Sequence, residues 1–290
     1  MEWTYALRQA VNFMESHLTE NIHTDDVARE VHISPYYLAS GFKLVTGYTP
    51  REYLRSRRLY CAALELLGGT EKIIDLAFRY GYETPESFTK AFTRFHGVPP
   101  SQIDSRHIRP FLPLKIKLTL QGGYDMDYTI EKMEVLPLIG VSRRFSYETS
   151  YQEIPKFWDE HFRLCQSGGY STEALKALEH FNVGEYAVCI DDQAESGTFR
   201  YMIAGVYTGG PVPEGLELHE LPAATWAKFR CLGPLPGALQ SVNTQVYQQW
   251  LPGNPNYEMS GNYNIEWYSC GDTASPDYES AIWLPVRARS

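Results

Sequence analysis

A glutamate flanked by aromatic residues near the C-terminus has the chemistry best suited to binding in this 290-residue chain. The run 263–268 (YNIEWY) has the composition of a strand, whose two-residue period places Glu266 and Tyr268 on one face and Ile265 and Trp267 on the other. A carboxylate beside a tyrosine suits an organic cation, which gains charge attraction in a partly dry site and cation–π contact with the ring. From spacing alone, an ordinary surface glutamate is the more frequent outcome, because Glu is mostly exposed in proteins.

A second set of candidate residues follows from a repeat in the first hundred residues. The residues that recur, at an offset of about fifty, are Ala28, Ile33, Pro35, Leu38, Phe42, Gly47 and Pro50, which return as Ala77, Tyr82, Pro85, Phe88, Phe92, Gly97 and Pro100. Each copy indicates a helix, a tight turn and a second helix that opens on proline after Ser34 or Thr84, which is the helix-turn-helix pattern. Two tandem copies can present recognition helices to successive major-groove faces about 34 Å apart.

The first turns of each recognition helix are expected to face DNA. The predicted DNA-contacting residues are Ser34, Tyr36, Tyr37, Ser40 and Lys43 in the first copy, Arg51 after it, and Pro85, Glu86, Ser87, Lys90 and Arg94 in the second. Glu86 could accept a hydrogen bond from cytosine or support the helix dipole. The dipole role is favoured, because a carboxylate near phosphates is costly. Lys90 stands where the first copy has Ser40, so the second copy is expected to contribute more to DNA binding.

Apolar spacing and capping residues predict the helices of this region. They are expected over 4–17, from 24 onward, over 35–46, over 50–67, from 70 onward and over 85–96. Thr24, Ser34, Thr70 and Thr84 are expected to cap four of these helices, and Gly47 to end one.

The net charge of −9 is unevenly distributed. Residues 1–110 contain 13 Lys and Arg and 13 Asp and Glu, whereas residues 111–290 contain 13 and 22. Within the neutral part, a basic cluster opens the 50–67 helix; its members are Arg51, Arg55, Arg57 and Arg58. A locally basic face can bind phosphates, although a solvated helix face is the more frequent meaning of such a cluster.

Other kinds of chemistry have little support in the sequence. The five cysteines, Cys61, Cys165, Cys189, Cys231 and Cys270, show no metal-ligand spacing, so free buried thiols and no cofactor or metal are expected, with redox sensing or metal binding as a minor alternative. No nucleophile elbow or paired Cys/His motif predicts a catalytic residue, and the acidic loop at Asp191 and Asp192 is expected to be a solvated turn. No apolar run could span a bilayer and no signal-peptide pattern opens the chain, so a cytoplasmic protein without a membrane partner is expected.

Short motifs extend over residues 24–102. They are Ser34-Pro35-Tyr36-Tyr37-Leu38, Phe42-Lys43, Thr46-Gly47, Tyr53-Leu54, Arg57-Arg58-Leu59, Ile74-Asp75-Leu76-Ala77, Gly81-Tyr82, Phe88-Thr89-Lys90-Ala91-Phe92 and Gly97-Val98-Pro99-Pro100-Ser101. In these motifs the segment resembles the AraC/XylS family of transcriptional regulators. The resemblance implies an all-helical DNA-binding domain that acts at promoters, with double-stranded promoter DNA as a partner and RNA polymerase as a further candidate. The family usually has Arg where Ser40 stands, and without that guanidinium the commonest route to guanine readout is missing.

Residues 126–290 are expected to form an α+β domain. Strands are predicted over 127–135, 138–145, 185–190, 199–207, 216–220, 225–231, 263–270 and 278–286, and helices over 151–165, 172–180 and 235–249. This order corresponds to two β-β-α-β-β-like repeats, with Leu136-Pro137 and Leu221-Pro222 in matching places. A cleft between such halves, lined by aromatic residues, is the default ligand-site hypothesis. The run 115–120 is predicted as a further strand, close to the domain boundary.

The second domain also carries family motifs, in order and with suitable spacing. They are Ile154-Pro155, Trp158, Tyr201, Gly205, Leu221-Pro222-Ala223, Phe229, Gly233-Pro234, the run 247–252, Glu266-Trp267-Tyr268 and the run 282–286. In these motifs the domain resembles GyrI-like effector-binding domains, and the domain order is similar to that of Rob-type regulators. The resemblance implies a lipophilic, often cationic, small-molecule effector recognised by a strand glutamate, whose position Glu266 matches. The residues expected to line the site with it are Tyr268, Trp158, Tyr201, Trp226 and Trp283, although large aromatic residues of this kind are usually core.

The sequence thus predicts a multidomain chain. An all-α domain with two helix-turn-helix motifs is expected over 1–107, a linker over 108–125 and a GyrI-like α+β domain over 126–290. The predicted function is that of a non-enzymatic, sequence-specific DNA-binding regulator controlled by a small molecule. Two alternatives stay open: a GyrI-like hydrolase of reactive electrophilic compounds with Glu266 as general acid or base, and a protein-binding module that uses the acidic domain.

Overall fold

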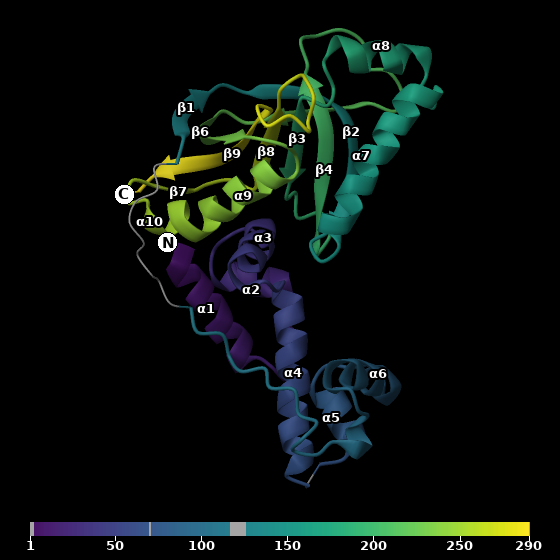
Figure 1. The fold of residues 1–290 in the computed structure, drawn as a ribbon, viewed down its shortest axis with the longest axis vertical. Coiled ribbons are helices and arrows are strands. Elements are labelled where there is room, and N and C mark those ends of the chain that lie inside the picture. The colour runs from purple at the N-terminus through teal and green to yellow at the C-terminus, as the bar shows by residue number, and fades with distance from the viewer. Residues whose placement is uncertain (1–2, 70, 117–125, 290) are drawn as a thin grey trace. The chain divides into compact units, whose positions relative to one another are not determined.

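The computed structural model describes residues 3–69, 71–116 and 126–289, which divide into a helical unit and a β-rich unit (Figure 1). The helical unit holds residues 3–116 and the β-rich unit holds residues 126–289 of this described part. The predicted strand over 115–120 lies mostly outside the described residues, and its first two residues form no strand. Within the described ranges, no helix is long and apolar enough to cross a membrane. The precise limits predicted for the two domains and the linker stay predictions.

The helical unit contains two helix-turn-helix motifs joined by a long helix. Its elements are α1 (Trp3–Ser16), α2 (Thr24–Glu30), α3 (Pro35–Thr46), α4 (Pro50–Leu67), α5 (Ile73–Arg79), α6 (Pro85–His96) and a 3-10 turn (Pro100–Gln102). The bounds of α3, α4 and α6 agree with those predicted from the sequence.

Local chemistry explains why both recognition helices begin and end where they do. The hydroxyls of Ser34 and Thr84 accept hydrogen bonds from backbone N–H groups three residues later, at 3.2 and 3.1 Å. Proline follows each cap at the first helical position, where its missing N–H costs nothing. Gly47 and Gly97 end the helices with φ of 82° and 84°, a left-handed conformation that glycine adopts without strain.

Of the predicted caps, Thr24 is wrong and Thr70 lies outside the described residues. The N-cap of α2 is His23 and not Thr24, because the Asp26 carboxylate accepts a hydrogen bond from the backbone N–H of His23 at 2.9 Å. Helix α5 begins at Ile73 after Lys72 as its N-cap, whereas Thr70, the predicted cap, is not among the described residues.

Arg57 of α4 is a structural residue of the helical unit. Its guanidinium donates from Nε and Nη2 to the two carboxylate oxygens of Glu15 on α1, both at 2.8 Å. The remaining Nη1 donates to the backbone oxygen of Phe111 at 2.5 Å, and the Tyr53 hydroxyl donates to the same carboxylate at 2.6 Å. Only 7% of the Arg57 side chain is exposed, so this charge is not available to DNA.

Arg58 also makes hydrogen bonds within the helical unit. It donates to the backbone oxygens of Leu18 and Glu20, at 2.8 and 2.5 Å. The basic cluster expected from the sequence is therefore reduced to Arg51 and Arg55, which are exposed.

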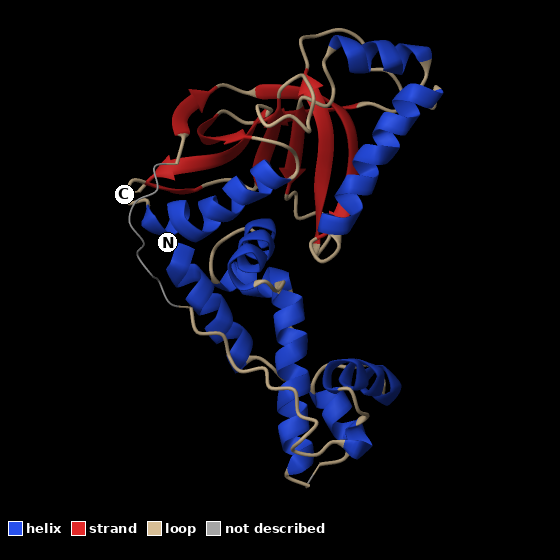
Figure 2. Cartoon of the chain, viewed as in Figure 1, coloured by secondary structure: helices blue, strands red, loops and turns tan. Residues whose placement is uncertain are grey.

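The β-rich unit is built on one antiparallel sheet with helices packed along it (Figure 2). Its elements are β1 (Tyr128–Met133), β2 (Leu136–Ser146), α7 (Ser150–Ser167), α8 (Thr172–His180), β3 (Tyr186–Ile190), β4 (Thr198–Val206), β5 (Glu217–Leu221), β6 (Ala224–Leu232), α9 (Gly237–Gln245), a π-helical turn (Val246–Trp250), α10 (Leu251–Gly253), β7 (Tyr257–Met259), β8 (Tyr263–Tyr268) and β9 (Glu279–Ala288). The eight predicted strands and three predicted helices are present, with ends shifted by a few residues. The short β7 was not predicted.

The strand order β1-β6-β9-β8-β3-β4-β2-β5 interleaves the two halves of this unit, and β7 adds to β9. The first half supplies β1, β2, α7, β3 and β4, and the second half supplies β5, β6, α9, β8 and β9. Strands β3 and β8 pair where the halves meet, while β1 pairs with β6 and β5 pairs with β2. This arrangement confirms the predicted α+β fold with two repeats.

The two faces of the sheet differ in what covers them. Helix α7 packs through Phe157 against Phe145 of β2, with ring centroids 5.7 Å apart. The π-helical turn packs through Trp250 against Phe229 of β6, at 4.9 Å. Both contacts lie on the same face, which we call the helical face. The opposite face carries a separate core cluster, made of Leu138, Tyr186, Val188, Ile190, Met202, Ala204, Leu221, Trp226, Ile265, Ala281 and Trp283.

Candidate DNA-binding and effector sites

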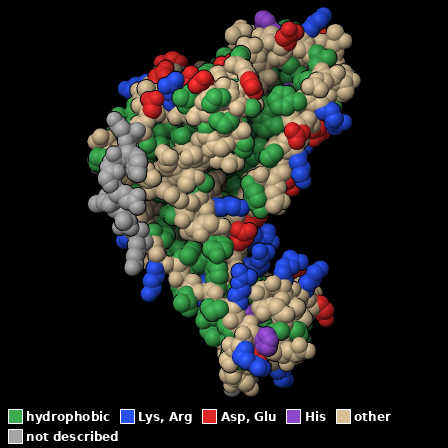
Figure 3. Space-filling view, in the orientation of Figure 1, with side chains coloured by type: hydrophobic (Ala, Val, Ile, Leu, Met, Phe, Trp, Pro, Cys, Tyr) green, Lys and Arg blue, Asp and Glu red, His purple; other side chains and the backbone are tan. Residues whose placement is uncertain are grey.

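Helix α6 presents a polar face that is suited to DNA. Phe88 and Phe92 are fully buried in the core shared with α4 and α5. On the other side, Glu86, Ser87, Lys90 and Arg94 are exposed. A shallow hollow runs along this face, lined by Pro85, Glu86, Thr89, Lys90, Thr93 and Arg94. Figure 3 shows several Lys and Arg side chains on the part of the helical unit where Figure 1 labels α6. The predicted contacts of the second copy therefore lie together on one surface.

Helix α3 and the residues next to it carry the predicted contacts of the first copy. Ser34, Tyr36, Ser40 and Lys43 are half-buried, and Arg51 just after the helix is exposed. Tyr37 is buried. The DNA contacts predicted for these residues, Tyr37 included, stay predictions.

Replacing Lys90 with alanine should weaken DNA binding about tenfold, because one cation on the exposed face of α6 is lost. Replacing Ser40 with alanine should change the affinity less than about twofold, since a half-buried hydroxyl carries no charge. Fluorescence anisotropy with a genomic fragment retained by the wild-type protein measures the affinity of both variants. The number of ions released on binding, taken from the salt dependence of the affinity, should fall by about one for Lys90→Ala only. Equal effects would contradict the expectation that α6 contributes more to DNA binding than α3.

Glu266 lies on the helical face of the sheet. It pairs across β9 with Ile282, which pairs with Phe229 of that face. Its Oε2 accepts hydrogen bonds from the hydroxyls of Tyr268, at 2.8 Å, and Tyr201, at 3.3 Å. Burial raises the pKa of Glu266, and the two hydroxyl donors offset part of that rise by stabilising the carboxylate. The residue is still half-buried and not sealed, so its charge is both poorly solvated and reachable.

Aromatic side chains from α7 stand beside this carboxylate. The indole N–H of Trp158 donates to the Tyr201 hydroxyl at 2.9 Å, and its ring meets that of Tyr268 edge-on at 5.7 Å. Phe162, one helical turn later, lies 5.5 Å from Trp158 and is 53% exposed. Next to it, His161 is buried and bonded through Nδ1 to the Tyr170 hydroxyl at 3.0 Å, and burial lowers the pKa of this imidazole.

Phe162 and His161 were not predicted from the sequence. Their spacing of three and four residues from Trp158 is the signal that could have found them, since such residues share a helix face. The structure thus brings together Glu266, Tyr268, Tyr201 and Trp158 as expected and adds an exposed phenylalanine at the rim of the group.

Trp226 and Trp283, in contrast, do not belong to this group. Trp283 pairs with Ile265, the neighbour of Glu266, and therefore points to the opposite face of the sheet. Both tryptophans lie in the core cluster of that face, with ring centroids 6.4 Å apart. The Lys228 ammonium lies over the Trp283 ring, 3.9 Å from its centroid. Their prediction as effector-lining residues beside Glu266 is contradicted by this register.

Comparison with known proteins agrees with the two units. Residues 27–106 match a helix-turn-helix domain family, and residues 129–286, more than half of the chain, match the integron-associated effector binding protein family, Cass2. The chain belongs to the AraC-type regulators with a Cass2/GyrI-like effector-binding domain.

Individual relatives of this AraC-type regulator cover different parts of it. The right origin-binding protein of Escherichia coli K12 is 30% identical over 167 residues, which are 55% of this chain and 55% of the relative. The regulatory protein SoxS of Salmonella typhimurium is 34% identical over 101 residues, 35% of this chain and 92% of SoxS. The chain spans about half the length of the first of these relatives. A solved structure of SAV2435 bound to tetraphenylphosphonium is 24% identical, with a TM-score of 0.45, over 56% of this chain and 94% of that chain.

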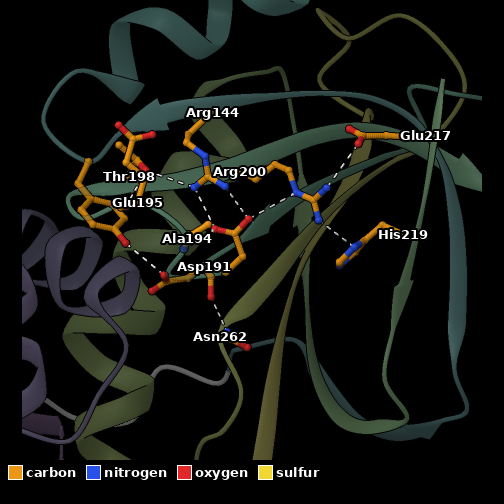
Figure 4. A network of polar contacts seen from close by, with 11 residues as sticks. Arg144, Asp191, Ala194, Glu195, Thr198, Arg200, Glu217, His219 and Asn262 are labelled. Carbon is orange, nitrogen blue, oxygen red and sulfur yellow. Dashed lines mark hydrogen bonds and ion pairs between the residues drawn. The ribbon is translucent and has the colours of Figure 1, made fainter. Parts of the chain in front are cut away.

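The acidic loop of this AraC-type regulator is structural and not a solvated turn (Figure 4). Asp191 is fully buried and accepts a hydrogen bond from the Tyr147 hydroxyl at 3.2 Å. Asp192 is held by both terminal nitrogens of Arg144, at 2.9 and 2.7 Å, which lowers the pKa of its carboxyl. Arg200 lies 3.9 Å from the same carboxylate. Asp192 is thus paired with two arginines, while Asp191 is held by a tyrosine hydroxyl.

Arg200 extends this network to β5, where it reaches Glu217 at 3.4 Å and the Nδ1 atom of His219 at 3.0 Å (Figure 4). Burial, together with the charge of Arg200, lowers the pKa of His219, in keeping with Nδ1 as an acceptor. Across the described ranges, no group of three or more His, Cys, Asp or Glu side chains could hold a metal ion.

Proposed function

We propose that this chain is a sequence-specific DNA-binding transcription regulator whose activity is controlled by a lipophilic cation. The observation that supports DNA binding is the division of α6 into two sides. Lys90 and Arg94 line a shallow hollow on its exposed side, and Phe88 and Phe92 are buried on the other. A recognition helix needs that division, because one side must anchor in the unit while the other contacts base edges and phosphates. Membership in the AraC-type family supports the same role for α3.

Control by a cation rests on Glu266. A carboxylate that the protein desolvates attracts a positive charge more strongly than one in water, and nearby ring faces add cation–π and apolar contact. Glu266 has both, with Tyr201, Tyr268 and Trp158 around it and the exposed ring of Phe162 beside them. A hydrated metal ion gains little there, because the surrounding groups supply few additional oxygen ligands. A bulky aromatic cation is therefore the favoured effector class.

The proposal places the protein in the cytoplasm, where promoter DNA is found, and assigns it no reaction. Contact with RNA polymerase would follow if the protein activates promoters. The relatives that resemble its helical unit are regulators by name, which favours binding over turnover.

The deciding experiment selects genomic DNA fragments with the full-length protein, with and without tetraphenylphosphonium. We expect a small set of related sequences to be retained, and their occupancy to change at least severalfold when the cation is present. A protein in which Lys90 and Arg94 are both replaced by alanine is the control for DNA binding. Retention of random fragments alone, or an occupancy indifferent to every lipophilic cation tried, would contradict the proposal.

A further inference from the structure

Three side chains from three elements form a chain of hydrogen bonds that ends on Glu266. Trp158 on α7 donates from its indole nitrogen to the hydroxyl oxygen of Tyr201 on β4, at 2.9 Å. The Tyr201 hydroxyl in turn lies 3.3 Å from Oε2 of Glu266 on β8. Tyr268 donates to the same oxygen from within β8, at 2.8 Å.

The chemistry of these groups sets the direction of the chain. An indole N–H can only donate, so the Tyr201 oxygen accepts from Trp158. Its single hydroxyl hydrogen is then left to donate elsewhere, and Glu266 is the acceptor within reach. Without the Trp158 N–H, the Tyr201 hydroxyl could rotate away from Glu266. Its hydrogen bond to that carboxylate, already long at 3.3 Å, would then be weaker.

We propose that Trp158 is a positioning residue of the effector site: its indole N–H orients the Tyr201 hydroxyl toward Glu266 and so keeps that carboxylate ionised for a cation. The inference rests on the proposed binding of a cation at Glu266. It differs from a stacking role for Trp158, because it depends on the N–H group and not on the ring.

Several titratable groups near Glu266 must be considered when binding is measured between pH 4 and pH 8.5. The titratable groups that face it are Tyr201 on β4, Tyr268 on β8, Cys189 on β3, Cys231 on β6, Tyr247 on the π-helical turn and, beside Trp158, His161 on α7. Burial raises the pKa of the tyrosines, and it raises the pKa of Cys231 to about 12. Burial lowers the pKa of His161 and raises that of Glu266, so the two transitions move toward each other. The carboxyl carbon signal of Glu266 assigns the transition to this residue, because it reports that carboxyl group and not the imidazole.

The test compares Trp158→Phe with Trp267→Phe. Phenylalanine keeps an aromatic ring at position 158 and removes the N–H. Trp267 is a matched control, because its indole also donates to a carboxylate, that of Glu185, at 2.9 Å. Trp267 lies on the face of β8 opposite Glu266, so its loss should leave the effector site unaltered. Tetraphenylphosphonium binding is measured by calorimetry from pH 4 to pH 8.5 in each full-length protein.

In Trp158→Phe the pH midpoint of binding should rise by about one unit, while affinity at pH 8.5 stays within about threefold of wild type. Trp267→Phe should keep the wild-type midpoint. Tyr201→Phe should reproduce the shift, and the double variant should add little to either single change, because both remove the same link. A wild-type midpoint in a folded Trp158→Phe protein would overturn the inference.

A second measurement separates this inference from the proposed function. The carboxyl carbon signal of Glu266, followed by NMR in the ligand-free protein, reports its titration directly. A rise of the midpoint in Trp158→Phe without any tetraphenylphosphonium binding in wild type would leave Trp158 as a positioning residue and refute the cation effector. Normal binding with an unshifted carboxyl titration would refute the positioning role and leave the effector standing.

Discussion

Replacing Glu266 with glutamine should weaken the binding of tetraphenylphosphonium about 100-fold at pH 7.5. Opposite charges about 4 Å apart attract by about 4 kcal/mol at an effective dielectric constant near 20, and desolvation leaves about 2 to 3 kcal/mol of that. Glutamine keeps the shape and one acceptor oxygen for Tyr201 and Tyr268, so the loss reports charge and not packing. Calorimetry on the full-length proteins measures the difference.

The pH dependence of the same experiment has a definite sign. A cation needs the ionised carboxylate, and the pKa of Glu266 is raised by burial. Binding should therefore be full above that raised pKa and should be lost as the pH falls through it, whereas the glutamine variant should show no such transition. Glu185→Gln is the matched control, since Glu185 accepts from Trp267 at another place on the sheet. Equal affinities for Glu266→Gln and wild type would remove the electrostatic basis of effector recognition.

Replacing Arg57 with methionine should destabilise the helical unit by about 3 to 5 kcal/mol, because it leaves the Glu15 carboxylate without its bidentate partner. The backbone oxygen of Phe111 loses a donor in the same variant. Methionine fills most of the space of the aliphatic stem, so the effect comes from lost charge pairing. Urea unfolding followed by far-ultraviolet circular dichroism gives the free energy, and amide exchange in α4 assigns the loss to this unit.

Arg55→Met is the control for that experiment. Arg55 is exposed on the same helix, so its replacement should change stability by less than about 0.5 kcal/mol. Both variants remove one positive charge from α4. Similar losses from the two replacements would show that net charge, and not the buried pair, stabilises the helix.

The sequence predicts the recognition helices well because their limits depend on neighbouring residues. Ser34 and Thr84 cap through their own hydroxyls, and Gly47 ends a helix through its own φ. The cap of α2 was misplaced by one residue, since a histidine there relies on Asp26 to complete the hydrogen bonding. Thr24 is a more common cap type, and residue preference alone favoured it.

The candidate effector site was predictable only within single strands. The two-residue period correctly separates Glu266 and Tyr268 from Ile265, but it does not say which residue of β9 lies opposite. The pairing of Ile265 with Trp283 sends that tryptophan to the other face of the sheet. Cross-strand register arises from the assembled sheet, and a single sequence does not contain it in readable form.

Arg57 illustrates the same limit for charge. In the sequence it belongs to a run of arginines typical of a basic surface. Its partner Glu15 is 42 positions away, so no local pattern identifies the pair. Buried ion pairs of this kind appear only when tertiary contacts are known.

The interleaved strand order has a consequence for synthesis on the ribosome. Among the described residues, strand β1 pairs only with β6, which follows it after about 90 residues. At roughly 5 to 20 residues per second, the nascent chain carries β1 without its partner for about 5 to 18 seconds. During that time an unpaired edge is open to other chains, so a message truncated after β4 should yield an aggregating product instead of a half-sized effector domain.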